Sequence, residues 1–201
     1  MMRVERPLAL NLGSGYLVIK EYNGYEFVNI DIDNANLPWA VQKGAQFICM
    51  DLSKNQLPFA PSSVSFINMS EFFEHLNLRD GVALLKDCYR VMTSGGQIRI
   101  SVPNAELLLD DYLKAQLDKF ASIQPTEYSH YRSQMTKFGL ILFGAMSGHG
   151  ELGHKMCYDP ASLHEIMLDI GFRNVFQSAH DETLDASVAR DHEMILVASK
   201  P

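Results

Sequence analysis

The sequence has little cysteine, no long apolar run and no excess of positive charge. Its cysteines, Cys49, Cys88 and Cys157, are odd in number and scattered, which is typical of a reducing compartment rather than of a disulfide framework. The longest apolar stretch, residues 138–146, contains two glycines and is too short to cross a bilayer. The first seven residues lack the apolar core of a signal peptide. We therefore expect a cytoplasmic protein with no membrane partner.

The charge balance argues against nucleic acid as a partner. The chain has 17 basic and 24 acidic residues and a net charge of −7, so a phosphate backbone would be repelled overall. With 201 residues, 47% of them hydrophobic, the chain can bury one sizeable core. Because no repeat, low-complexity tract or linker interrupts it, we predict a single domain over residues 1–201.

Apolar runs alternate with helical periods along most of the chain, which predicts an α/β fold with a mainly parallel sheet. Two helices are well marked, over residues 79–92 and from Asp159-Pro160 to Gly171. Asp is a good N-cap, Pro suits the first helical position, and Gly is typical of a C-terminal end. The expected strands are 8–12, 27–32, 46–50, 63–69, 97–102, 174–179 and 192–199.

Two segments depart from this regular pattern. Only residues 16–26 connect Gly15 to the second strand, which leaves room for a short helix or none. Residues 105–158 form an insertion, predicted to start with one long helix whose apolar positions include Leu109, Leu113 and Leu117. Insertions of this length at the carboxyl edge of a sheet are usually functional lids or caps.

A glycine-containing turn follows the first predicted strand. Leu8–Leu12 runs into Gly13-Ser14-Gly15, and the next strand ends on Asp31, eighteen positions after Gly13. Glycines let the backbone approach a ligand closely, and a carboxylate at the tip of the next strand can accept both ribose hydroxyls. The pattern predicts a nucleoside-bearing cofactor. A nicotinamide-dependent oxidoreductase is disfavoured because Val18 stands where a third glycine would be.

Several blocks in order resemble a class I S-adenosylmethionine-dependent methyltransferase of the type-11 group. The blocks cover nearly the whole chain outside the insertion. They are Leu10-Asn-Leu-Gly-Ser-Gly15, Val28-Asn-Ile-Asp31-Ile-Asp33, Asp51-Leu52 with Leu57-Pro-Phe, Ser63-Val to Glu71-Phe-Phe-Glu-His75-Leu, Leu85 to Met92, Ser94-Gly-Gly96, Arg99 to Asn104, His154-Lys155 with Tyr158-Asp159, and Gly171-Phe172. The resemblance implies a Rossmann-like, doubly wound sheet of seven strands, mainly parallel with an antiparallel last strand, and S-adenosyl-L-methionine as cofactor.

The resemblance also implies roles for the residues at the strand ends. Gly13, Ser14 and Gly15 would let the backbone pass beneath the methionine part of the cofactor. Asp31, with Asp33 as the alternative, would accept from the ribose, since a carboxylate offers only acceptors. The other implied contacts are Asp51 to the adenine amino group, Ile32 and Leu52 to the adenine ring, and Ser70 and Glu71 beneath the sulfonium. Tyr16 departs from the family pattern, which usually has a third small residue there.

Methyl transfer from a sulfonium needs alignment more than acid–base help. His75, just after the fourth predicted strand, is the best-placed base for a hydroxyl or amine acceptor, although it could instead brace its loop. His154, Lys155 and Tyr158, where the insertion returns to the sheet, are candidates for binding the acceptor. We expect no metal, because the spacing of His149, His154 and Cys157 fits no common zinc pattern.

These inferences together predict a methyltransferase that acts on a small molecule or a glycan precursor. The alternative is a non-catalytic methyltransferase-like module that binds a partner through residues 105–158. The apolar insertion could also serve as a homodimer interface.

Overall fold

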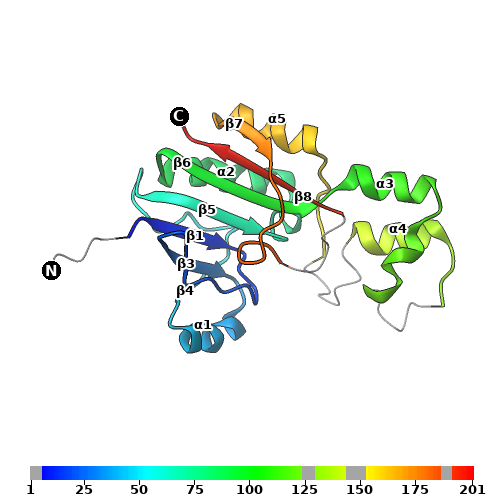
Figure 1. Ribbon diagram of the computed structural model, residues 1–201, viewed down its shortest axis with the longest axis horizontal. Coiled ribbons are helices and arrows are strands. Elements are labelled where there is room, and N and C mark those ends of the chain that lie inside the picture. Colours follow the sequence, from blue (N-terminus) through cyan, green and yellow to red (C-terminus); the bar gives the residue numbers. More distant parts are fainter. Residues whose placement is uncertain (1–5, 124–129, 144–152, 187–191) are drawn as a thin grey trace.

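The computed structural model describes residues 6–123, 130–143, 153–186 and 192–201. The described residues form one eight-stranded sheet with helices packed against it (Figure 1). Its strands are β1 (Leu8–Leu12), β2 (Glu21–Tyr22), β3 (Tyr25–Asp31), β4 (Gln46–Cys49), β5 (Val64–Ser70), β6 (Met92–Pro103), β7 (Arg173–Gln177) and β8 (Glu193–Ser199). The seven predicted strands are all present, and β2 is the additional one.

The strand order is β2-β3-β1-β5-β6-β8-β7, with β4 paired to β3. β4, β3, β1, β5 and β6 run parallel, and β8 runs antiparallel to both β6 and β7, as predicted for the last strand. The prediction of seven strands was wrong by one. The two residues of β2 pair with Tyr25 and Glu26 at the start of β3, and such a short pairing leaves no apolar alternation to detect.

The two predicted helices cover one face of the sheet. α2 (Leu78–Val91) buries Leu84, Leu85 and Cys88, and α5 (Pro160–Ile170) buries Leu163 and Met167, all in one core with the strands. Asp159 is the N-cap of α5, and its side chain accepts from the Ser162 amide; Gly171, with a left-handed φ of 119°, is the C-cap. The sequence signals at both ends of α5 are therefore confirmed.

The other face is covered differently. Ala9, Phe27 and Phe66 pack there against Ile19 and Leu184. Residues 16–26 are all described and contain β2 but no helix, as the shortness of this connection predicted. A short helix, α1 (Leu37–Lys43), instead follows β3 and was not predicted, because Leu37, Trp39 and Val41 are exposed and leave no apolar stripe.

The insertion lies beyond the carboxyl ends of the parallel strands, where α3 and α4 extend from the sheet (Figure 1). It contains α3 (Ala105–Leu113), a 3-10 helix (Leu117–Ile123) and α4 (Gln134–Leu142). The predicted single long helix was wrong, because Ala115 adopts a left-handed φ of 56° and breaks it. The insertion has its own small core around Leu108, Leu117 and Phe120.

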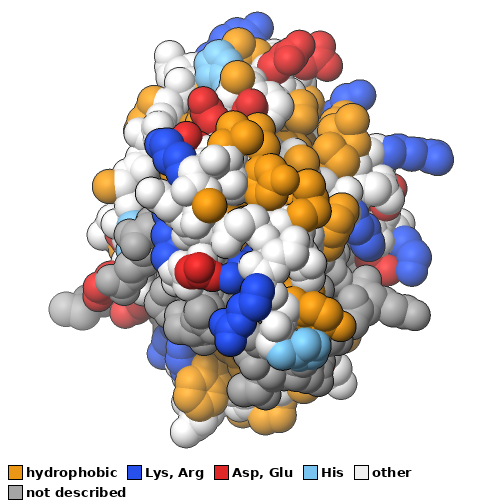
Figure 2. Space-filling model, turned by 90° about the vertical axis from the view of Figure 1, so that its right-hand side faces the viewer, with side chains coloured by type: hydrophobic (Ala, Val, Ile, Leu, Met, Phe, Trp, Pro, Cys, Tyr) orange, Lys and Arg blue, Asp and Glu red, His pale blue; other side chains and the backbone are white. Residues whose placement is uncertain are grey.

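Figure 2 shows this end of the molecule, with hydrophobic side chains exposed among lysines, arginines and acidic residues. Leu109 and Leu113, two apolar positions of the predicted long helix, are exposed. No helix in the described part of the chain combines the length and the hydropathy of a membrane span.

Candidate functional site

The candidate site lies where the parallel strands end. β1 is followed by Gly13, β3 ends at Asp31, β4 leads to Asp51, and β5 ends at Ser70. Since β1, β3, β4 and β5 are hydrogen-bonded parallel neighbours, their carboxyl ends meet at one edge of the sheet. This is the edge at which open α/β sheets bind ligands.

The glycine turn folds back onto β3. The amides of Gly13 and Ser14 both donate to the carbonyl oxygen of Ile30, at 2.8 and 3.2 Å. The amide of Gly15 donates to the Oδ2 atom of Asp31 at 2.7 Å. The turn and the acidic strand end, predicted to form one site from their spacing, are therefore in direct contact.

Asp31 has acceptor capacity left for a ligand. Its Oδ2 accepts from Gly15 and its Oδ1 accepts from the Asp33 amide at 2.8 Å. A carboxylate has about four lone-pair sites, so each oxygen can accept once more. Asp33 itself uses Oδ1 to accept from the Ala35 amide, as an N-cap of the following turn.

Gly13 lies against the side chain of Phe72, a contact that the sequence did not reveal. A Cβ atom built on Gly13 would lie 2.0 Å from Cγ of Phe72, and the φ angle of Gly13 is +65°. Phe72 thus packs directly on the turn. Gly15 also has a positive φ, of +46°, but a Cβ there would meet nothing within 4 Å. The side of Gly15 is therefore open, and that of Gly13 is filled.

The predicted adenine contacts differ in their surroundings. Ile32 is 54% exposed at the end of β3, and Leu52 is buried. The Asp51 carboxylate accepts from the Ser53 amide at 3.0 Å and the Ser53 hydroxyl at 2.6 Å, and it pairs with Lys54 at 2.8 Å. Lys54 and then Ser53 lower the pKa of Asp51 to about 2, so this carboxylate is ionised and already partnered.

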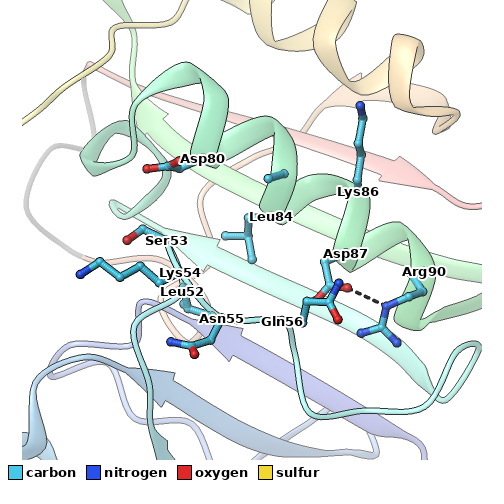
Figure 3. Close-up of a pocket in the computed structure, with 11 residues that line it drawn as sticks. Leu52, Ser53, Lys54, Asn55, Gln56, Asp80, Leu84, Lys86, Asp87 and Arg90 are labelled. Carbon is cyan, nitrogen blue, oxygen red and sulfur yellow. Dashed lines mark hydrogen bonds and ion pairs between the residues drawn. The ribbon is translucent and has the colours of Figure 1, made fainter.

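A cavity of about 330 Å³ lies beside this loop, between residues 52–56 and α2 (Figure 3). Leu84, Asp87 and Arg90 of α2 line its far wall, and Arg90 is ion-paired to Asp87. Leu52 lines this cavity, whereas Gly13, Gly15 and Asp31 do not. The cavity is therefore adjacent to the candidate site rather than being the site itself.

Ser70 and Glu71 follow β5 in a buried, polar environment. The Ser70 hydroxyl accepts from the Ala186 amide at 2.8 Å. Glu71 has a left-handed φ of 51°, and its amide donates to the Ser101 carbonyl at 3.0 Å. Burial first, and then the negative charges of Glu193 and Asp185, raise the pKa of Glu71 above its ordinary range.

His75 and His154 come from distant parts of the chain and lie together. Their ring centroids are 5.0 Å apart with an interplanar angle of 70°. The Nδ1 atom of His154 lies 3.2 Å from the Leu142 carbonyl oxygen. Burial first, and then His75, lower the pKa of His154 to about 4, so the ring is neutral near pH 7. A carboxylate oxygen of Glu74, which the sequence analysis did not single out, lies within 4.8 Å of a ring nitrogen of each histidine.

Lys155 and Tyr158, the other two residues predicted to bind the acceptor, lie in different surroundings from each other. The Lys155 amide donates to the Glu74 carbonyl at 2.9 Å while its side chain is exposed. Tyr158 is only 1% exposed, with its ring 5.2 Å from that of Phe73. This burial favours a packing role for Tyr158 over the predicted contact with an acceptor. His149 lies outside the described residues.

The arrangement fits a nucleoside-bearing cofactor. Asp31 retains free acceptor capacity, Gly15 has an open side, and Ile32 leaves an apolar side chain exposed next to Asp31. The Ser14 hydroxyl is buried in the turn without a hydrogen-bond partner among the residues described. A ligand at this edge would therefore lie near the Asp31 carboxylate, the apolar side chain of Ile32 and the turn that contains the Ser14 hydroxyl.

Comparison with known proteins agrees with this geometry. A family model described as a methyltransferase domain matches residues 10–100, which include every strand end of the site. Comparison with curated proteins gives no match.

Solved structures with similar folds cover nearly the whole chain. An S-adenosylmethionine-dependent methyltransferase from Archaeoglobus fulgidus is 18% identical over 97% of this chain and 86% of its own, with a TM-score of 0.63. One from Thermotoga maritima is 16% identical over 100% and 84%, with a TM-score of 0.58. A TehB-like one from Corynebacterium glutamicum is 15% identical over 100% and 83%, with a TM-score of 0.55. At these identities the likeness shows the fold alone. The chain therefore has the fold of these S-adenosylmethionine-dependent methyltransferases, and its residues 10–100 match the model of the methyltransferase domain.

Proposed function

We propose that the chain is an S-adenosylmethionine-dependent methyltransferase that acts on a small molecule or a glycan precursor. The observation that carries the proposal is the contact of the glycine turn with Asp31, at 2.7 Å between the Gly15 amide and Oδ2. This contact fixes an acceptor carboxylate beside an open glycine at the ligand-binding edge of the sheet. The negative net charge supports a substrate other than nucleic acid.

The cofactor, when bound, supplies a methyl group on a sulfonium, which is already an activated leaving group. Asp31 would accept from the ribose hydroxyls, and Ile32 and Leu52 would flank the adenine. Ser70 and Glu71 follow β5, at the end of the site where transfer would occur. The main task of these residues is alignment, because proximity and orientation supply much of the acceleration of such a reaction.

His75 is the proposed base for an acceptor that must lose a proton, since imidazole titrates near neutral pH. It lies in the 3-10 helix Phe73–His75, directly after the β5 end, and contacts the ring of His154. His154 and Lys155 would orient the acceptor from the side of the insertion. The acceptor would thus lie between the sheet edge and residues 153–158.

Replacement of Asp31 tests the proposal. Asp31→Ala leaves two ribose hydroxyls without an acceptor in a partly buried site, at a cost of about 1–3 kcal/mol. Affinity for S-adenosylhomocysteine should fall by about tenfold or more, measured by titration calorimetry. Asp33→Ala is the matched control, because Asp33 is acidic, exposed and two residues away.

Equal affinities of wild type and Asp31→Ala would exclude Asp31 as the ribose acceptor. If the wild type itself bound neither S-adenosylmethionine nor S-adenosylhomocysteine, the enzyme proposal would be wrong. A methyltransferase-like module that binds a partner through the exposed apolar side chains of the insertion would then be favoured.

A further inference from the structure

Glu74 is a buried carboxylate that the proposed reaction does not use. Its side chain is 2% exposed. Within the described residues, neither of its two carboxylate oxygens has a hydrogen-bond partner. Burying a carboxylate without a partner is unfavourable, and proteins normally satisfy such groups with a donor, an opposite charge or a metal ion. Burial first, and then the negative charge of Glu71, raise the pKa of Glu74 well above its ordinary range, so a cation that pairs with Glu74 would displace its proton.

Two histidines face this carboxylate. The His154 Nε2 atom lies 3.8 Å from Oε1 of Glu74, too far for a hydrogen bond. One ligand atom from each of Glu74, His75 and His154 lies within 4.8 Å of the other two. Two imidazoles and one carboxylate form a donor set that first-row transition metals accept with coordination positions to spare.

The orientation of His154 is fixed by its other nitrogen. Nδ1 lies 3.2 Å from the Leu142 carbonyl oxygen, which can only accept, so Nδ1 carries the proton. Nε2 is then the unprotonated nitrogen, and it is the one nearest to Glu74. A backbone carbonyl that holds the far nitrogen of a histidine is the usual support of a metal ligand.

A small cavity lies beside two of the three groups, Glu74 and His154. Its volume is about 20 Å³, about the room of one water molecule. Much of its remaining wall is apolar and comes from the insertion, including Leu108, Ile141 and Leu142. An apolar shell around a polar donor set limits solvent access to a bound ion.

A second cluster of similar composition lacks these features. His180, Asp185 and Glu193 also lie within 4.8 Å of one another. However, Asp185 is ion-paired with Arg99 and accepts from the Asp181 amide at 2.7 Å. Glu193 accepts from the Ser101 hydroxyl and lies 2.9 Å from Nδ1 of His180. Because both carboxylates already have protein partners, this cluster is a structural hydrogen-bond network.

We propose that Glu74, His75 and His154 bind one divalent first-row transition-metal ion, of the class of Zn²⁺, Mn²⁺ or Fe²⁺. Metal–ligand distances of roughly 2.0–2.2 Å bring the donor atoms of a site to roughly 3–4 Å from one another. This proposal departs from the expectation of no metal in the sequence analysis. Glu74 and His75 are distant in sequence from His154, so no local spacing of the three residues indicates a metal site.

The position of the ion suggests its ligand. His75 follows the β5 end and His154 leads out of the insertion, so the ion would lie at the edge of the sheet proposed for the acceptor. This role rests on the proposed function and replaces the base role of His75 there: with His75 bound to it, the ion would hold an oxygen atom of the acceptor and lower the pKa of that group. Metal binding itself does not depend on that function.

Titration of the metal-free full-length protein with Co²⁺ and Zn²⁺ tests the proposal. We expect one equivalent to bind by calorimetry, and Co²⁺ to give visible absorption bands of a protein-coordinated ion. Glu74→Gln and His154→Ala should each weaken binding by about tenfold or more. His164→Ala on the exposed side of α5 is the control and should leave binding unchanged. Zn²⁺ should raise the melting temperature of the wild type and not that of His154→Ala.

Glu74→Gln guards against misreading a folding defect as a binding defect. The Glu74 carboxylate has no described partner to lose, so the metal-free variant should melt no lower than the metal-free wild type. Absence of stoichiometric binding to wild type, or binding unaffected by both Glu74→Gln and His154→Ala, would overturn the proposal. Binding of S-adenosylhomocysteine is measured separately on metal-free protein, so failure of the metal site and failure of the methyltransferase proposal are distinguishable.

Discussion

Two glycines of the same turn have different reasons to be glycine. Gly13 combines a φ of +65° with Phe72, whose ring occupies the space of a Cβ, whereas Gly15 has only a φ of +46°. A left-handed conformation costs about 1–2 kcal/mol for a residue with a Cβ, and overpacking typically adds about 1–3 kcal/mol. Gly13→Ala should therefore lower the free energy of unfolding by about 2–5 kcal/mol, and Gly15→Ala by about 1–2 kcal/mol, in urea denaturation. Similar losses for the two variants would show that Phe72 moves aside at little cost.

The candidate site was predictable at the residue scale where its members are close in sequence. The glycine turn and Asp31 lie at the ends of neighbouring strands, so their spacing predicted that they belong to one site, and the structure has the Gly15 amide in contact with Asp31. Glu74 was not predictable as a buried, unpartnered group, because its burial depends on residues 154–156, whose Lys155 and Met156 amides donate to the Glu74 carbonyl. Nor could the sequence show that Tyr158, in a block with His154, lies in the core.

Among the elements, α5 offers the sharpest test because its start rests on one side chain. The Asp159 carboxylate accepts from the Ser162 amide at 2.7 Å, and the Ser162 hydroxyl oxygen accepts from the Asp159 amide. Asp159→Ala should cost about 1 kcal/mol of stability, measured by urea denaturation near pH 7. The hydrogen bond from the Ser162 amide lowers the pKa of Asp159 below 3.8, so this stabilisation is present above pH 3.8 and is lost as the pH falls through the lowered pKa. A difference between wild type and variant that stayed constant into that acid range would contradict the capping role.

The elements that were predicted correctly carry their signals locally. β1 and β5 are short apolar runs, and α5 is bounded by Asp159 and Gly171. The long helix failed because helical periodicity persists across Ala115, where the backbone turns left-handed. α1 had detectable end signals, Pro38 near its start and Gly44 after its end, but its exposed apolar residues obscured them. Periodicity identifies an element only when one face packs on the core.

At the scale of the whole molecule, the apolar surface of the insertion is the feature that a lid or an interface would use. Leu113, Met135 and Phe143 of the insertion are exposed. If the insertion is a lid over the acceptor, amides in residues 130–143 and 153–158 should exchange faster in the empty protein. They should become protected with S-adenosylhomocysteine and an acceptor, as hydrogen exchange measured by mass spectrometry would show. Full protection in the empty protein, together with a dimer in solution, would replace the lid with a subunit interface.

The place of β8 in the sheet has a consequence for how the chain is made. β8 is hydrogen-bonded between β6 and β7, although it follows both in sequence. While a ribosome has not yet released residues 193–199, one long edge of β6 has no neighbour, and β7 has no strand through which to join the sheet. A nascent chain in that interval would expose an adhesive β edge together with Ile98 and Ile100. Completion of this sheet therefore depends on β8, and chaperone protection would matter most just before β8 emerges.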